Sequence, residues 1–243
     1  MNLLNEIWKF SINPQLKPFN KTSVSFGGFF KTLLIFYGVA FVSAIPIIII
    51  VKLIEKINGI NLNEIRNNHF LNINHGFYII IVMVFLGPLI EETICRLWLS
   101  FKKPHIIISL ITIIWILTTK FQGIIIYNQV FDYHFFKNLF FAIFLGFVGF
   151  YIFQIIAPQK KISPNYFKIL YWFSCTGFGL IHILNFTPIK INIIWVYPFL
   201  VLPQLIMGYF LGYLRLRKGF WVGVVFHGLA NLVPALIYFF AQK

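Results

Sequence analysis

The stretch GPLIEETICRLWL, residues 87–99, places three charged side chains, Glu91, Glu92 and Arg96, inside an otherwise apolar run. The whole chain of 243 residues holds only six acidic residues, so an adjacent pair in such a run is unusual. Hydrophobic residues make up 59% of the chain and charged residues only 11%, against roughly 25% charged residues in soluble domains. We therefore expect this stretch to lie in a membrane-spanning helix of an all-α, polytopic membrane protein.

Apolar runs close to the roughly 20 residues that cross a bilayer recur along most of the chain. They predict a helical bundle of about seven spans, with a range of about six to eight. The predicted spans are residues 30–54, 76–100, 104–120, 138–157, 167–187, 192–214 and 219–240. Residues 57–75 are rich in asparagine and are predicted to form a polar loop. Residues 121–137 fit a loop, an interfacial piece or part of the fourth span.

The N-terminal residues 1–29 are predicted to form an interfacial segment, because Leu3, Leu4, Ile7 and Trp8 recur at helical spacing. Residues 30–243 would then form a single transmembrane domain. Lys and Arg are more numerous on the membrane side that holds the N-terminus, so we expect that side to be cytoplasmic. The net charge of +14 is scattered over the ends of apolar runs, which fits contacts with membrane lipids and argues against nucleic acid as a partner. Composition also favours a bacterial plasma membrane.

The three charges near residue 91 have different explanations. A charge at the centre of a spanning helix costs about 2.5–3.5 kcal/mol, so each needs a partner or a wet cavity. Glu92 and Arg96 are four residues apart and can pair on one helix face. Glu91 points about 100° away from that face and lacks the partner. Pro88 is expected to kink or begin the helix just before the acidic pair. A structural ion pair thus explains Glu92 and Arg96 but not Glu91.

Two later spans carry polar side chains as well. FGLIHILN, residues 178–185, contains Phe178 and His182. GFWVGVVFHGLANLVP, residues 219–234, spaces four residues at intervals of four and so on one helix face: Gly219, Gly223, His227 and Asn231. At about 1.5 Å per residue from the flanking basic residues, the polar groups of all three spans lie about 14 to 21 Å into the membrane. Either histidine alone could be a hydrogen-bonded packing residue, but the common depth favours one shared cavity.

Such a cavity could support water attack on an amide without a Ser or Cys nucleophile. A carboxylate in a low-dielectric cavity suits a general base near neutral pH, and a neighbouring histidine can share the proton. Amide and imidazole N–H groups can donate to a developing oxyanion. Cys95 lies one turn from Glu91 but has no evident base, and Cys175 is expected to be an apolar core residue. Glu91, His182 and His227 could instead ligate zinc, although the usual HExxH spacing is absent.

Three motifs resemble those of one family. EETICR at 91–96 resembles the EExxxR motif of the CAAX protease and bacteriocin-processing (CPBP, or ABI) family, and FGLIH at 178–182 and HGLAN at 227–231 resemble its FxxxH and HxxxN motifs, in the same order. The resemblance covers roughly residues 76–240. It implies that Glu91 activates water with the help of His182, and that His227 and Asn231 stabilise the oxyanion.

The resemblance further implies that Glu92, Arg96 and Phe178 brace the site. A glutamate mechanism that requires no cofactor is favoured, because an Asn is a poor zinc ligand and an apt hydrogen-bond donor. Zinc is the alternative. The chain departs from the family pattern between the first two motifs, where residues 97–177 leave room for two additional spans.

The resemblance implies an intramembrane endopeptidase that acts on a peptide or a lipidated peptide. CAAX members of the family cut after a prenylated cysteine, and other bacterial members are linked to bacteriocin maturation or immunity. One alternative is a non-proteolytic immunity factor or membrane scaffold with an unused site. The other is a proton-coupled transporter, which the lack of internal repeats disfavours.

Overall fold

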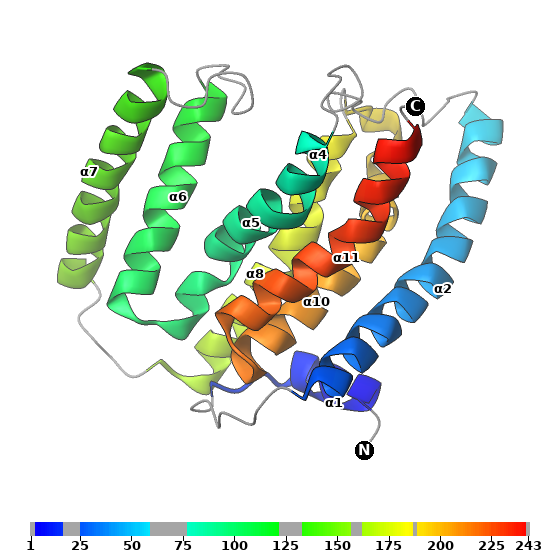
Figure 1. The fold of residues 1–243 in the computed structure, drawn as a ribbon, viewed down its shortest axis with the longest axis horizontal. Helices are drawn as coiled ribbons and strands as arrows, with labels where there is room; N and C mark the ends of the chain where they lie inside the picture. The colour runs from blue at the N-terminus through cyan, green and yellow to red at the C-terminus, as the bar shows by residue number, and fades with distance from the viewer. Residues whose placement is uncertain are drawn as a thin grey trace.

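The computed structural model describes residues 3–16, 25–58, 77–121, 133–156, 162–186 and 189–241. Within these residues the chain is helical and forms no strand (Figure 1). The α-helices are α1 Leu3–Ile12, α2 Phe26–Asn58, α4 Tyr78–Ile81, α5 Gly87–Cys95, α6 Lys103–Phe121, α7 Tyr133–Ile156, α8 Pro164–Ile181, α9 Tyr197–Leu200, α10 Leu202–Arg217 and α11 Phe220–Ala241. Short helices of other types are η2 Val82–Leu86, η3 Leu97–Ser100, η4 His182–Asn185 and η5 Ile191–Val196. The predicted all-α fold class is confirmed.

Each of the seven predicted spans corresponds to helical structure. Four described segments are long and apolar enough to cross a membrane: Phe26–Ile57, Phe135–Ile152, Pro164–Asn185 and Phe220–Ile237. A fifth is added if Ile191–Leu200 and Leu202–Arg217, which meet at a bend of 44°, count as one span. Lys103–Thr119 forms a shorter apolar helix. Of the predicted polar loop at 57–75, only residues 57 and 58 are described, at the end of α2. In the ambiguous segment at 121–137, residue 121 ends α6 and residues 133–137 begin α7, whereas residues 122–132 lie outside the described residues.

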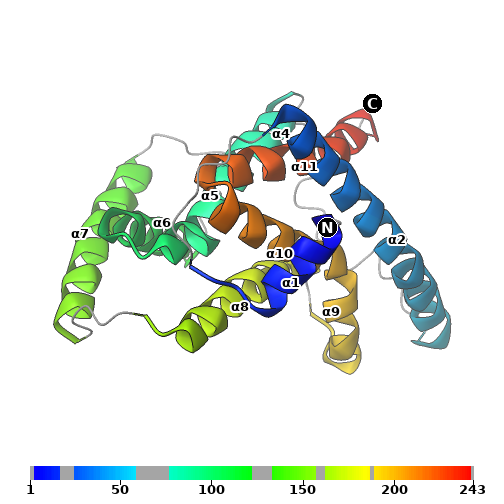
Figure 2. The ribbon, with the colours of Figure 1, turned by 90° about the horizontal axis from the view of Figure 1, so that it is seen from below.

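The helices form a bundle in which most axes run in a similar direction (Figure 1). Helix α10 packs against α8, α11 and α2, while α5 packs against α6, α8 and α11. Helices α6 and α7, which occupy the interval between the first two motifs, form a pair at one edge of the bundle, and α2 lies at the opposite edge (Figures 1 and 2). The additional helices therefore extend the bundle sideways without separating α5 from α8.

Helix α1 crosses the end of the bundle near α10 and α8 (Figure 2). Ile7 and Phe10 are buried against the bundle, whereas Trp8 is 67% exposed. The Tyr213 hydroxyl donates to Glu6 Oε1 at 2.7 Å, which ties α1 to α10. Residues 3–12 are thus helical, as their spacing predicted. Their location at a membrane interface stays a prediction.

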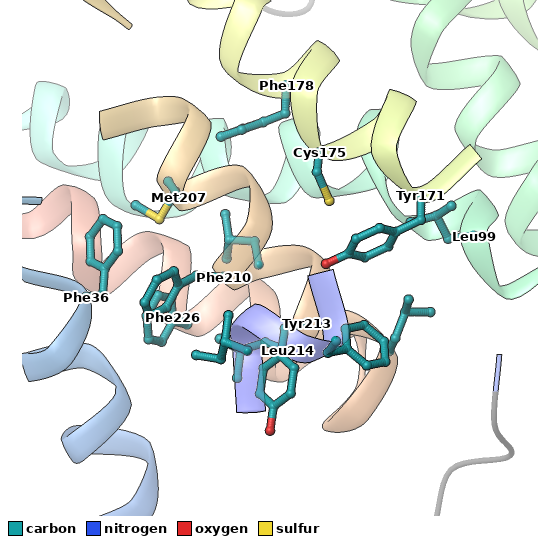
Figure 3. Packing of buried hydrophobic residues seen from close by; sticks show 14 of the residues in the cluster. Phe36, Leu99, Tyr171, Cys175, Phe178, Met207, Phe210, Tyr213, Leu214 and Phe226 are labelled. Carbon is teal, nitrogen blue, oxygen red and sulfur yellow. The ribbon is translucent and has the colours of Figure 1, made fainter. Parts of the chain in front are cut away.

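The core is formed by α8, α10, α11, α2 and α1, whose buried side chains meet in one cluster (Figure 3). Small residues allow the close approach of α8 and α10. A Cβ at Gly208 would overlap the Cys175 carbonyl oxygen, and one at Gly212 would lie 2.5 Å from Cys175 Sγ. Cys175 is fully buried in this contact, as expected for a core cysteine.

The predicted span 76–100 is an interrupted helix. Helix α4 continues into the π-helix η2, α5 begins at Gly87 with Pro88 in its first turn, and η3 follows a break at Arg96. Pro88 lacks an N–H group, and the first turn of an α-helix tolerates that absence. Pro88 thus lies just before the acidic pair, where the π-helix changes to an α-helix within a backbone that is helical on both sides.

The predicted helix face of Gly219, Gly223, His227 and Asn231 is one residue shorter than expected. Gly219 precedes α11, with φ of 112°, a value that L-residues with side chains rarely adopt. Its N–H donates to the Leu214 carbonyl at 3.1 Å and closes the end of α10. Gly219 therefore makes the turn between α10 and α11, and the polar face of α11 begins at Gly223.

Two glycines of α11 predict opposite responses to the same substitution. A Cβ at Gly228 would overlap the Val84 carbonyl oxygen in η2, whereas a Cβ at Gly223 would lie 3.6 Å from Glu92 Oε2, an ordinary contact distance. Gly228→Ala should destabilise the protein by about 1–3 kcal/mol, because backbone must move to admit the methyl group. Gly223→Ala is the matched control and should change the stability by less than about 1 kcal/mol. Thermal unfolding in detergent measures both, and equal midpoints would contradict the packing of α11 on η2.

Candidate active site

Glu92 and Arg96 form a buried ion pair at the centre of the molecule. Both side chains are 0% exposed, and Arg96 Nη1 lies 2.5 Å from Glu92 Oε1. Arg96 Nη2 donates to the Gly208 carbonyl at 3.3 Å, and the guanidinium lies 4.2 Å from the centre of the Phe178 ring. Hydrogen bonds, an opposite charge and an aromatic face together offset the cost of burying the cation. The predicted pairing of Glu92 with Arg96 is confirmed.

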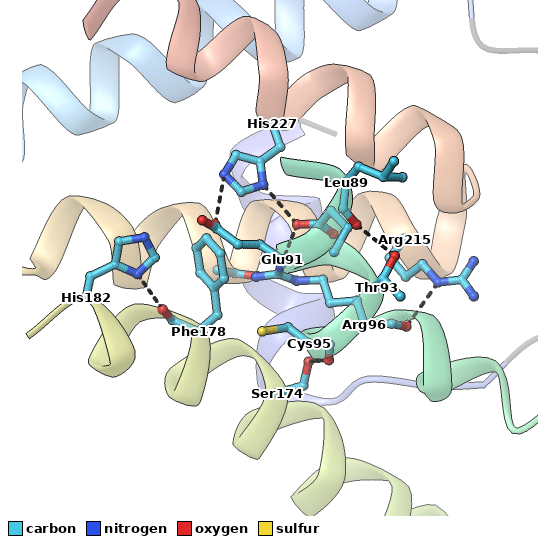
Figure 4. A network of polar contacts seen from close by, with 12 residues as sticks. Leu89, Glu91, Thr93, Cys95, Arg96, Ser174, Phe178, His182, Arg215 and His227 are labelled. Atoms are coloured by element: carbon cyan, nitrogen blue, oxygen red, sulfur yellow. Dashed lines mark hydrogen bonds and ion pairs between the residues drawn. The ribbon is translucent and has the colours of Figure 1, made fainter. Parts of the chain in front are cut away.

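His227 lies between the two adjacent carboxylates (Figure 4). Its Nδ1 is 3.1 Å from Glu92 Oε1, and its Nε2 is 3.6 Å from Glu91 Oε2. An ionised carboxylate only accepts hydrogen bonds, so Nδ1 carries a proton toward Glu92. Nε2 of His227 and Oε2 of Glu91 attract each other when a proton is bound to one of the two atoms. His227 of α11 is therefore the direct partner of Glu91. The spacing of residues within the helix of Glu91 could not predict this partner, because it comes from another helix.

Glu91 differs from its neighbour Glu92 in its access to the surroundings. The Glu91 side chain is 38% exposed, whereas that of Glu92 is fully buried. Glu91 Oε2 itself is buried and accepts no hydrogen bond from the described residues. Glu91 thus presents an unsatisfied oxygen toward His227 on a side chain that is partly exposed at the surface of the helix bundle, whereas Glu92 is bonded to both Arg96 and His227.

Phe178 separates the two histidines of the site. Its ring centre lies 5.0 Å from that of His182 and 5.4 Å from that of His227. His182 is placed where α8 ends and η4 begins, and its Nδ1 lies 2.8 Å from the Phe178 carbonyl oxygen. Nδ1 therefore donates to that carbonyl, which leaves Nε2 of the neutral ring as an acceptor. His182 thus contacts the rest of the site by way of the ring and the carbonyl of Phe178.

Asn231 lies one turn beyond His227 on α11. Its Nδ2 donates to the Met83 carbonyl at 3.1 Å, and Met83 belongs to the π-helix η2. A side-chain amide has two N–H groups, so this bond uses one and leaves the other. The structure thus brings Glu91, Glu92, Arg96, Phe178 and His227 into direct contact, and holds Asn231 and His182 beside them through backbone carbonyls.

Sequence reasoning missed three further polar side chains that hold this helix: Ser109, Ser174 and Arg215. The Ser109 hydroxyl of α6 donates to the Thr93 carbonyl at 2.7 Å, and that of Ser174 in α8 donates to the Cys95 carbonyl at 2.6 Å. Arg215 of α10 donates to the next two carbonyls along the chain, those of Arg96 and Leu97. A sequence does not show which backbone carbonyls a fold leaves without partners. Only Arg215 carried a signal, as a charge close to an apolar run.

The alternative zinc ligands do not fit a metal in this arrangement. Among the described residues, no group of three His, Cys, Asp or Glu side chains is placed to hold a metal ion. Nδ1 of His227 is bonded to Glu92 and Nδ1 of His182 to the Phe178 carbonyl, an arrangement that histidines also show when the other ring nitrogen binds a metal. What weighs against zinc is therefore the lack of a gathered set of three ligands among the described residues, and not the hydrogen bonds of the histidines.

The comparison with protein families yields one match, which spans the three motifs. Residues 73–233 match the family described as type II CAAX prenyl endopeptidase, Rce1-like. No curated protein and no solved structure matches the chain. The match covers α4 to the middle of α11 and so includes every contact of the site described above. Since it extends over more than half of the sequence, and the helices are those of an integral membrane protein, the chain belongs to the Rce1-like family of type II CAAX prenyl endopeptidases.

Proposed function

We propose that this protein hydrolyses a peptide bond of a prenylated peptide within the membrane, with Glu91 as the general base. Family membership makes it an endopeptidase, and the prenylated substrate and the mechanism are the finer proposal. The contact that carries the mechanism is that between Glu91 Oε2 and His227 Nε2, at 3.6 Å. A partly exposed carboxylate adjacent to an imidazole can take a proton from a water molecule bound beside it, and the imidazole supports the carboxylate as it does so.

Glu92 and Arg96 support this role by fixing the orientation of His227. Arg96 holds Glu92 in the ionised form, and Glu92 accepts the Nδ1 proton of His227. The imidazole is then turned so that Nε2 faces Glu91. An acceptor that fixes one ring nitrogen of a histidine sets the tautomer and the direction of the other nitrogen.

In the proposed reaction a water molecule, positioned between Glu91 and Nε2 of His182, attacks the scissile carbonyl carbon. The water proton passes to Glu91 as the new C–O bond forms, and the carbonyl oxygen becomes an oxyanion. His227 acts in its imidazolium form, with Nδ1–H held by Glu92. Its Nε2–H, released by Glu91 once that carboxylate has taken the water proton, and the second N–H of Asn231 donate to the oxyanion. When the C–N bond breaks, Glu91 returns its proton to the leaving amine. No protein atom becomes covalently attached to the substrate.

A defined peptide assay tests this function. Purified protein in phospholipid bilayers is given a farnesylated peptide with three residues after the modified cysteine, and the same peptide without the lipid. We expect mass spectrometry to detect the released tripeptide from the lipidated peptide only. A zinc chelator and the substitution Cys95→Ala should each leave kcat within about threefold of the untreated wild type, since neither a metal nor a thiol takes part.

Two results would contradict the proposal. Failure to cleave any lipidated peptide would remove the assigned substrate class. Loss of activity in chelator, restored by added zinc, would replace the glutamate mechanism with the metal-dependent alternative.

A further inference from the structure

Arg215 is a buried cation that the proposed reaction does not use. It lies on α10 and is 4% exposed. Its Nε donates to the Arg96 carbonyl and its Nη2 to the Leu97 carbonyl, both at 3.1 Å. These carbonyls lie where α5 stops and η3 begins, at the break marked by the Arg96 backbone φ of −132°. The end of a helix leaves carbonyls without intrahelical donors, and a cation at that end is favoured by the helix dipole.

Two separate hydrogen bonds join Arg96 to α10. Arg215 donates to the Arg96 backbone, and the Arg96 side chain donates to the Gly208 carbonyl on α10. Gly208 and Arg215 are seven residues apart, which places them two turns apart on one face of α10. One face of α10 is therefore bonded both to the Arg96 backbone, where the side chain begins, and to the guanidinium at its end.

We propose that Arg215 is a positioning residue for the reaction, which acts by fixing the backbone of Arg96. This inference rests on the proposed function of Glu91. Arg96 orients Glu92, Glu92 orients His227, and His227 faces Glu91, so a shift of the Arg96 backbone moves the proton partner of the base. A misplacement of about 1 Å can lower a reaction rate by about 100-fold.

An arginine suits this position better than a lysine. Its guanidinium presents several donors in a rigid, planar fork, which here reaches two successive carbonyls, whereas a lysine ammonium is a single point on a flexible stem. Arg215 also lies 5.4 Å from the centre of the Phe220 ring, which restricts the fork further. Arg217 is the natural control, since its guanidinium lies over Phe10 of α1, 4.7 Å from the ring centre, away from the α5 break.

Kinetics on the farnesylated peptide test the proposal, with kcat expressed per monodisperse, folded protein. Arg215→Met should lower kcat by about 30- to 100-fold and change KM by less than about threefold, because substrate contacts are retained. Arg215→Lys, which keeps the charge and one hydrogen bond, should fold and lose about 3- to 10-fold in kcat. Arg217→Met should stay within about twofold of wild type.

The route through His227 is tested by repeating Arg215→Met in a His227→Gln background. There the same substitution should cost less than about threefold in kcat, because the partner it orients is already gone. An equal loss in both backgrounds, or an unchanged kcat for Arg215→Met and Arg215→Lys, would overturn the positioning role. Full activity of Glu91→Gln would instead overturn the proposed function, so the two failures are distinct.

Discussion

Glu91→Gln is expected to lower kcat for cleavage of the lipidated peptide by about 1,000-fold while leaving the fold intact. The glutamine amide has the shape of the carboxylate but cannot accept a proton from water. Because the Glu91 side chain is 38% exposed and makes no salt bridge with a lysine or arginine of the described residues, the neutral amide can be accommodated without burying an unpaired charge. Steady-state kinetics, together with the thermal unfolding midpoint of the same preparation, measure both parts of this expectation.

Glu55→Gln is the matched control for that substitution. Glu55 lies on α2 and pairs with Lys52 at 3.1 Å, in a contact whose lysine side chain is 70% exposed. The Glu55 side chain is 16% exposed, and the pair lies on a helix outside the site. The control should keep wild-type kcat. A Glu91→Gln protein as active as this control would rule out Glu91 as the base.

Arg96→Met is expected to produce the largest loss of stability among single substitutions in the site, about 3–5 kcal/mol. It leaves the carboxylate of Glu92 buried without its cation, and also removes the donor to Gly208. The loss should appear as a lower thermal unfolding midpoint and as reduced yield of monodisperse protein. Arg217→Met, which removes a cation on the same side of the bundle but outside this ion pair, should shift the midpoint far less.

The double substitution Glu92→Leu with Arg96→Met separates stability from activity. Replacing both members of a buried ion pair by apolar side chains is often neutral or stabilising. The double variant should therefore unfold at a higher temperature than Arg96→Met alone, yet remain inactive, since His227 has lost the acceptor that orients it. An active double variant would show that the pair has no part in orienting the imidazole.

The features that the sequence predicted correctly depend on spacing along single helices. Apolar runs of sufficient length predicted the membrane bundle, and the interval of four between Glu92 and Arg96 predicted their ion pair. Both follow from the geometry of one helix, which needs no knowledge of neighbouring elements. The three motifs, each local, were likewise sufficient to indicate the family.

Contacts between helices could not be predicted in the same way. The interval between Glu91 and His227 along the chain says nothing of their contact at 3.6 Å, which depends on how α11 packs against α5. The role of Arg215 could not be predicted, because its acceptors are backbone carbonyls, which every sequence contains. The π-helix η2 arises in the uniformly apolar run VMVFL, where no residue signals an extra backbone position.

The position of His182 shows a subtler departure from a regular helix. Its backbone N–H donates to the Gly179 and Leu180 carbonyls, which leaves the Phe178 carbonyl free to accept from its side chain. The FxxxH spacing therefore reports a helix end in which the histidine side chain replaces a backbone donor. In a regular helix through residue 187, as predicted from hydropathy, the Phe178 carbonyl would also accept from the backbone N–H of His182.

The most direct test of the whole account is a kinetic cycle of Glu91→Gln, His227→Gln and the double variant, assayed on one lipidated peptide. If a carboxylate from one helix and an imidazole from another handle a single proton together, the double variant should be no more than about threefold slower than the slower single variant. A double variant whose loss equals the product of the two single losses would show that the two groups act independently, and would contradict the account.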